Sequence, residues 1–196
     1  MSEGQYVRFE SGGQPASYVF LYPASWQIEQ VTDDQYVRIF ITGPRSTKGT
    51  YNVMLGVQVA LSTSSTLEDA AAEFLGTPNS IYDYREVGRE HGSLSGDPAL
   101  EIEAVHHVPL PPRSIYSCIT VIRERHVFVK RADRLYKLWF TATEEDYQSW
   151  LETFRILVRT FSFTDEPAAA AFCPLITPRS ITAGESSDEP AAGGQK

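Results

Sequence analysis

Two adjacent histidines, His106 and His107, are the residues of this sequence that most suggest metal binding or proton transfer, since imidazole does both near neutral pH. They lie in an alternating stretch, 99–108, that predicts a β-strand. Because neighbouring strand residues point to opposite faces, the two rings cannot hold one metal ion without a bulge. We therefore interpret both as ordinary exposed histidines at a strand end, and the isolated His91 and His126 as surface residues.

The carboxylates Glu101 and Glu103 are two residues apart in that strand, so they share one face. Paired carboxylates perform acid–base work in glycosidases, but alternation with apolar neighbours is also typical of a half-solvated strand, and we favour the second interpretation. No phosphate-binding glycine loop or nucleophile-elbow motif occurs, and neither cysteine has a partner at zinc-finger spacing. The sequence predicts no catalytic residue, no metal site, no cofactor and no enzymatic activity.

Basic residues are concentrated in one place, between residues 123 and 137, where aromatic residues are interleaved with them. Such a pattern can bind nucleic acid, but a net charge of -8 and a pI near 5.0 disfavour it. A solvated hairpin edge protected by charge is favoured over nucleic-acid binding, and a surface for docking a protein is the alternative. The candidate docking surface consists of Arg123, Arg125, Lys130, Arg131, Arg134 and Lys137.

Aromatic residues are abundant, and they suggest a second candidate site, an aromatic-lined pocket formed by Trp26, Tyr36 and Trp139. Trp26 lies in the run FLYPASWQI, residues 20–28. Pro23 ends one strand there because it cannot donate to the ladder, and Trp26 starts the next extended segment. We interpret Trp26 as closing the end of a sheet under a helix, where its burial contributes about 2–3 kcal/mol.

Hydrophobic periodicity predicts mostly strands and two helices. Helix 66–75 follows a capping-box pattern at Ser65 and Glu68, and helix 144–159 follows Thr143 and has one apolar face that must lie against a sheet. The strands are expected at 6–10, 18–22, 36–41, 53–61, 82–90, 99–108, 115–125, 127–130 and 135–142, with turns at 92–98, 109–113 and 132–133.

The chain is expected to form one domain, residues 1–163, followed by a tail, residues 164–196, that is rich in Ala, Pro, Ser, Gly and Glu and largely disordered. Cys118 is expected in the core, and a disulfide with Cys173 is not required. The N-terminal sequence has no signal-peptide or lipobox pattern, and no apolar stretch is long enough to span a membrane. A cytoplasmic location is therefore expected.

Several short motifs together resemble the PsbP-like family, whose fold is shared by the extrinsic PsbP protein of photosystem II and the Ran-binding Mog protein. The motifs are Tyr22-Pro23-x-x-Trp26, Gly96-Asp97-Pro98-Ala99, Arg125-His126 followed by Leu135-Tyr136, and a helix with Trp150 that closes on Thr160-Phe161-Ser162-Phe163. The resemblance covers about Tyr18 to Phe163. It implies an α+β fold, an α-β-α sandwich with a central antiparallel sheet flanked by helices, and it implies binding rather than catalysis.

Three functional hypotheses follow. The leading one is a noncatalytic, PsbP-like module of a bacterium that docks or helps assemble a protein partner, on the concave face of the sheet or on the hairpin 123–137. The second is a small-ligand or enzymatic protein that uses the aromatic pocket. The third is an extrinsic protein associated with photosystem II, which the N-terminal sequence disfavours because it contains no export segment.

Overall fold

The computed structural model describes residues 5–12, 17–62, 64, 66–75, 82–112 and 115–164. The predicted tail from residue 165 onward, Cys173 and the predicted capping residue Ser65 lie outside the described residues.

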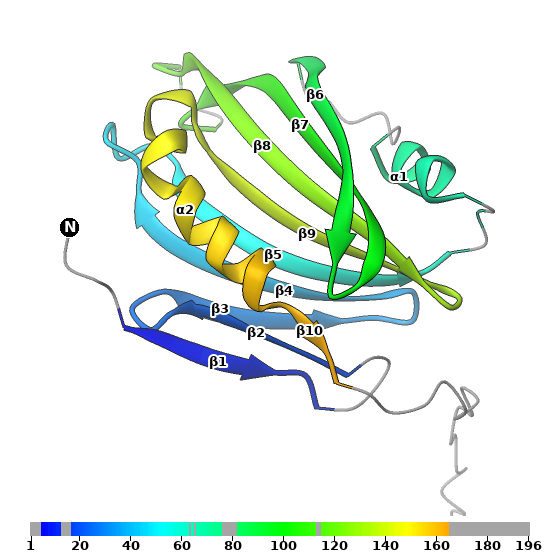
Figure 1. Cartoon of the computed structure of the whole chain (residues 1–196). Helices are drawn as coiled ribbons and strands as arrows, with labels where there is room; N and C mark the ends of the chain where they lie inside the picture. The colour runs from blue at the N-terminus through cyan, green and yellow to red at the C-terminus, as the bar shows by residue number, and fades with distance from the viewer. Residues whose placement is uncertain are drawn as a thin grey trace, which may run out of the picture.

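Two antiparallel sheets dominate the fold (Figure 1). A seven-stranded sheet has the order β3-β4-β5-β9-β8-β7-β6, and a small three-stranded sheet has the order β1-β2-β10. With the two helices α1 and α2, the described residues form the antiparallel α+β fold that the sequence predicts. The strands are β1 (Tyr6–Glu10), β2 (Tyr18–Pro23), β3 (Gln27–Thr32), β4 (Tyr36–Arg45), β5 (Asn52–Leu61), β6 (Tyr82–Leu94), β7 (Asp97–Leu110), β8 (Cys118–Arg131), β9 (Arg134–Thr143) and β10 (Ser162–Phe163).

The hairpin of β8 and β9 lies in the middle of the large sheet, between β5 and β7. The prediction that residues 123–137 form a sheet edge is therefore wrong. The predicted break at His126 is also absent, because β8 runs without interruption from Cys118 to Arg131. The predicted turn at 132–133 is confirmed. Cys118, expected in the core, is an exposed free thiol at the start of β8.

The turn between β6 and β7 is much shorter than the sequence predicted. It consists of Ser95 and Gly96, both with positive φ angles of 54° and 89°. Two residues with positive φ are characteristic of the tight hairpin turn whose twist matches that of the strands. Strand pairing consequently continues up to Leu94 and resumes at Asp97.

The helix α2 (Glu144–Thr160) confirms the predicted helix 144–159 almost residue for residue. Its apolar face packs on β9, where the Phe140 ring lies 5.0 Å from Tyr147 and 5.8 Å from Phe154 between centroids. The three-stranded sheet closes the same core, through Tyr18 and Phe20 of β2. The helix α2 and the small sheet thus cover the part of this face around β9, whereas β6 and β7 extend beyond α2 (Figure 1).

Trp26 belongs to this core, as the sequence predicts. It is 8% exposed, and its ring meets Trp150 of α2 edge-on at 5.6 Å. A Cβ added to Gly43 would lie 2.7 Å from the indole, so the absence of a side chain at residue 43 provides the space for the ring.

The helix α1 (Leu67–Leu75) packs on the other face of the large sheet. Its Ala70 and Ala71 contact a small cluster of alternate strand residues, Leu100, Ile102, Phe128 and Leu135. The neighbours of these residues in sequence, such as Val127 and Tyr136, belong to the core under α2. The hydroxyl of Thr66 caps α1 by accepting a hydrogen bond from the Asp69 N–H at 3.0 Å. A helix of this length covers only one end of the sheet (Figure 1).

Candidate binding face

The part of the large sheet that faces away from α2 and lies beside α1 carries polar and aromatic side chains. Strand pairing aligns Arg38 of β4, Gln58 of β5 and Lys137 of β9 in one row. The next row contains Phe40, Gly56, Trp139 and His126, and the third includes Met54, Thr141 and Glu124. The alternate residues of the same strands, Ile39, Val57, Leu138 and Val127, belong to the core under α2. We call these three rows the α1-side face.

Arg38 is held in a fixed position on this face. Its Nε donates a hydrogen bond of 2.8 Å to the Gln58 side-chain oxygen, and its guanidinium lies 3.8 Å from the centre of the Tyr36 ring. The carboxylate of Asp33, in the exposed turn before β4, accepts hydrogen bonds from the backbone N–H groups of Gln35 and Tyr36. Within the described part of the chain, Arg38 forms no ion pair, and the exposed Asp33 carboxylate acts on it only through a longer-range electrostatic attraction.

Lys137 follows Arg38 in the same row, and its Nζ lies 5.6 Å from the centre of the Trp139 ring. Burial of the ammonium group lowers the pKa of Lys137 to about 7. The carboxylate of Glu124 acts in the opposite direction, and the positive charge of Arg38 lowers the pKa further. At neutral pH this lysine is consequently poised between its charged and neutral forms.

Glu124 links two histidines on the face. Its carboxylate lies 3.0 Å from His126 Nε2 and 3.8 Å from His106 Nδ1. Both rings are buried, with exposures of 3% for His126 and 5% for His106, so the prediction that they are exposed is wrong. Burial lowers the pKa of each imidazole. Burial alone would raise the pKa of Glu124, but its contact with His126 and the nearby positive charges lower it.

These histidines do not form a metal centre. No group of three or more His, Cys, Asp or Glu side chains among the described residues is arranged to hold a metal ion. The Nδ1 atoms of His106 and His126 have no hydrogen-bond partner within the same part of the chain. The arrangement is therefore a buried polar cluster around one carboxylate.

Trp139 forms the apolar floor of the face. Its ring lies over Gly56, where an added Cβ would come within 2.2 Å of the indole, and it meets Phe40 edge-on at 5.7 Å. A glycine opposite a tryptophan on a neighbouring strand thus fixes the orientation of the ring.

The predicted docking surface is divided between the two faces of the sheet. Lys130 and Lys137 lie on the α1-side face, and Lys130 donates to the backbone carbonyl of Ser64. Arg123, Arg125 and Arg131 lie on the opposite face of β8, by alternation. The six residues consequently do not form one surface.

Each arginine of the divided surface has an acidic neighbour. Arg125 pairs with Glu101, Arg123 pairs with Glu103 across β7 and β8, and Arg123 also reaches Glu144 at 2.9 Å. These pairs give Glu101 and Glu103 a structural role. Arg131 lies 3.4 Å from Asp97, and Arg134 lies 3.8 Å from Asp133.

The three aromatic residues of the predicted pocket are also separated. Trp26 lies in the core under α2, whereas Tyr36 and Trp139 lie on the α1-side face, and Tyr36 stacks on Arg38 rather than on Trp139. Tyr36 contributes to a cavity of about 260 Å³ at the turn between β3 and β4, lined by residues 32–37, residues 59–61 and Arg134.

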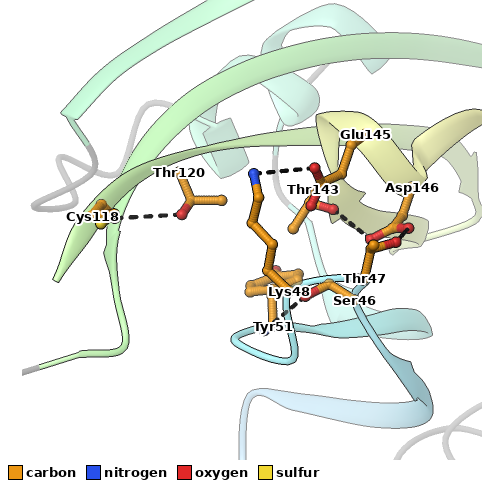
Figure 2. A network of polar contacts seen from close by, with 9 residues as sticks. All are labelled: Ser46, Thr47, Lys48, Tyr51, Cys118, Thr120, Thr143, Glu145 and Asp146. Atoms are coloured by element: carbon orange, nitrogen blue, oxygen red, sulfur yellow. Dashed lines mark hydrogen bonds and ion pairs between the residues drawn. The ribbon is translucent and has the colours of Figure 1, made fainter. Parts of the chain in front are cut away.

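A second polar network ties the loop between β4 and β5 to the start of α2 (Figure 2). The Asp146 carboxylate accepts hydrogen bonds from the Thr47 N–H at 2.9 Å, the Thr47 hydroxyl at 2.6 Å and the Thr143 hydroxyl at 2.8 Å. Lys48 reaches Glu145 at 3.1 Å in the same view. Burial alone would raise the pKa of Asp146, but these hydrogen bonds lower it. The network satisfies its own groups, so we assign it a structural role.

The chain shares its fold with known structures, although no sequence comparison identifies a family for it. No family model matches the chain, and the search of curated proteins found no match. Among solved structures, the fold is that of PsbP and Mog proteins. The cyanobacterial PsbP protein, CyanoP, of Synechocystis sp. PCC 6803 matches with a TM-score of 0.54 at 15% identity, over 84% of this chain and 96% of that one.

Two further structures share the fold. The Ran-binding protein Mog1p of Saccharomyces cerevisiae has a TM-score of 0.53 at 10% identity, over 83% of this chain and 97% of that one. The protein of unknown function PA94 from Pseudomonas aeruginosa has a TM-score of 0.53 at 14% identity, over 84% of this chain and 99% of that one. The resemblance to the PsbP-like fold inferred from the sequence motifs is thereby confirmed.

Within the described residues, no helix has the length and apolar character needed to cross a membrane.

Sequence reasoning missed most of the α1-side face, including Arg38, Gln58, Glu124 and the two buried histidines. One signal was present: a single polar residue interrupts an otherwise apolar strand at Gln58 in VMLGVQVAL and at Lys137 in LYKLWF. Polar side chains at such positions are either hydrogen-bonded inside the fold or exposed for binding.

Proposed function

We propose that this chain is a noncatalytic binding module that holds a protein partner on the α1-side face. The proposal includes the finer architecture, an α-β-α sandwich of the PsbP/Mog type in which α1 and α2 flank the large sheet, as well as the predicted bacterial origin and cytoplasmic location. Mog1p, which has this fold, is named as a Ran-binding protein, and that likeness supports a protein as the kind of partner.

One observation carries the proposal: the α1-side face places a charged arginine, a half-buried lysine and a tryptophan side by side, and neither of the two described helices packs on them. Arginine and tryptophan are the residues that most often dominate the energy of protein interfaces. On the opposite face, α2 and the three-stranded sheet cover the apolar core residues.

The cavity beside Tyr36 does not have the features of the aromatic pocket that the small-ligand hypothesis requires. Pockets that bury drug-sized ligands typically have volumes of about 300–1,000 Å³. The cavity of about 260 Å³ lies below that range, and neither Trp26 nor Trp139 lines it.

The test is affinity capture with matched variants. The full chain and the variants Trp139→Ala and Lys137→Glu would be compared with Arg155→Glu, which changes an exposed arginine on the outer side of α2. We expect a protein captured by the wild type and by Arg155→Glu to be lost with both face variants, provided that their circular dichroism spectra show a folded chain. Equal capture by all four chains would contradict the proposal.

A further inference from the structure

We propose that the α1-side face recognises a carboxylate of its partner, the side chain of an Asp or Glu in an acidic segment, and holds it between Arg38 and Lys137. The proposal rests on the proposed function, because the same face is the docking surface, and it adds the chemistry that the partner must present.

Arg38 provides the first half of the recognition. Its Nε is occupied by Gln58 and its plane is fixed by Tyr36, so the guanidinium is already oriented before a partner arrives. A guanidinium binds a carboxylate through two parallel hydrogen bonds, and a pre-oriented one loses less side-chain entropy on binding. No carboxylate of the described residues forms an ion pair with Arg38, whereas Arg123, Arg125 and Arg131 are all paired.

Lys137 provides the second half. It lies two strands from Arg38 in the same row, with Gln58 between them. Strands are spaced about 4.8 Å apart, so the two backbones are separated by about 10 Å, a gap that two long basic side chains can bridge through one carboxylate. The two charges already interact, since Arg38 contributes to lowering the pKa of Lys137.

The carboxylate already present on the face does not fill this position. Glu124 is one row further along β8, beside Thr141 rather than Lys137, and its oxygens are directed to His126 and His106. It therefore balances part of the charge of Lys137, whereas Arg38 has only the longer-range attraction of the exposed Asp33 carboxylate and no ion pair among the described residues. The apolar rings of Phe40 and Trp139 border the position, which favours an acidic residue flanked by apolar ones.

Protonation should be linked to this recognition. A carboxylate that binds beside Lys137 stabilises its charged form, so binding takes up a proton when the free lysine is partly neutral. Among the described residues, Glu124, Arg38 and His126 are charged or titratable groups that interact electrostatically with Lys137. Glu124 is ionised at neutral pH and burial keeps the His126 ring neutral there, so neither changes charge between pH 7 and 8. Affinity for the carboxylate should accordingly fall as the pH rises above 7.

The test uses two capped peptides as probes, acetyl-Leu-Glu-Leu-amide and acetyl-Leu-Gln-Leu-amide, titrated to millimolar concentration into the isotope-labelled full chain and followed by NMR. We expect the Glu peptide to shift the indole N–H signal of Trp139 and to raise the pKa of Lys137. We expect the Gln peptide to bind at least about tenfold more weakly, and the affinity of the Glu peptide to fall by up to about tenfold per pH unit above pH 7.

Three variants complete the test. Arg38→Gln should abolish binding of the Glu peptide, Arg38→Lys should weaken it because the planar fork is lost, and Arg155→Gln should leave it unchanged. Equal affinity for the two peptides, shifts that spare Trp139 and Lys137, or no shift at millimolar concentration would overturn the inference. If Trp139→Ala loses the captured protein partner but the Glu peptide does not bind the wild type, this inference alone is refuted. If the partner is captured equally by the wild type and by the face variants, the proposed function itself is refuted.

Discussion

The close contact between Gly56 and Trp139 makes the Gly56→Ala variant a sensitive test of the structure. An added Cβ at this position would lie 2.2 Å from the Trp139 ring and 2.5 Å from the backbone oxygen of Ile39. Ordinary contact begins at 3.4 Å, so the ring would have to move by about 1.2 Å (3.4 minus 2.2). The carbonyl of Ile39 cannot rotate away, because residues 39 and 57 are paired in the sheet.

The expected cost follows from this geometry. Overpacking a well-filled site typically costs about 1–3 kcal/mol, and the contact with a fixed backbone atom places Gly56→Ala near the upper end, at about 3 kcal/mol. For a chain of this size each kcal/mol lowers the thermal midpoint by about 2–4 °C, so we expect a decrease of about 6–12 °C.

Urea unfolding followed by tryptophan fluorescence and circular dichroism measures this cost. Gly92→Ala is the matched control, because an added Cβ there meets nothing within 4 Å, and we expect it to change the free energy of unfolding by less than about 1 kcal/mol. If Gly56→Ala were as stable as Gly92→Ala, Trp139 would not lie over Gly56, and the described α1-side face would be incorrect.

Three further changes test other parts of the structure. Lys137→Met should increase the free energy of unfolding most below pH 7, where the folded wild type must bury a charged lysine. Between pH 7 and 10.5 the folded lysine is neutral while the unfolded one keeps its proton, so the stability of the wild type rises and the difference between the two proteins shrinks by up to about 1.4 kcal/mol per pH unit. Urea unfolding across this pH range measures the sign of the change. Asp146→Asn should lower the free energy of unfolding by about 1–3 kcal/mol, because hydrogen bonds to the charged carboxylate are lost. Lys48→Gln removes an exposed ion pair and should change the free energy of unfolding by less than about 1 kcal/mol. Similar values for the two variants would be inconsistent with the network at α2. Trp26→Ala should cost about 3–5 kcal/mol because it empties the space beside Trp150, and a thermal melt that matches the wild type would contradict that packing.

Local patterns were sufficient to predict the helix α2, the strand that ends at Pro23 and the burial of Trp26. The apolar stripe of α2 and the acidic first turn, residues 144–146, act within one helix, so neighbouring residues carry the information. The motifs that indicated the PsbP-like fold are likewise short and local.

The candidate face was not predictable in this way. Alternation in β8 shows that His126 and Val127 point to opposite faces, but it does not show which neighbours each face meets. Strand order placed β8 and β9 in the centre of the sheet and thereby buried His126, which the sequence alone suggested was exposed. The same order split the basic residues of 123–137 between two faces.

The sequence by itself determined which residues form the α2 helix, which face of that helix is apolar and where the first strands end, because these depend on side chains a few positions apart. Only the tertiary structure decided that Arg38 and Lys137, about a hundred residues apart in sequence, stand in one row on either side of Gln58. The physical reason is that pairing between strands is set by hydrogen bonds and packing across the whole sheet, and a local pattern contains no record of which strand becomes its neighbour.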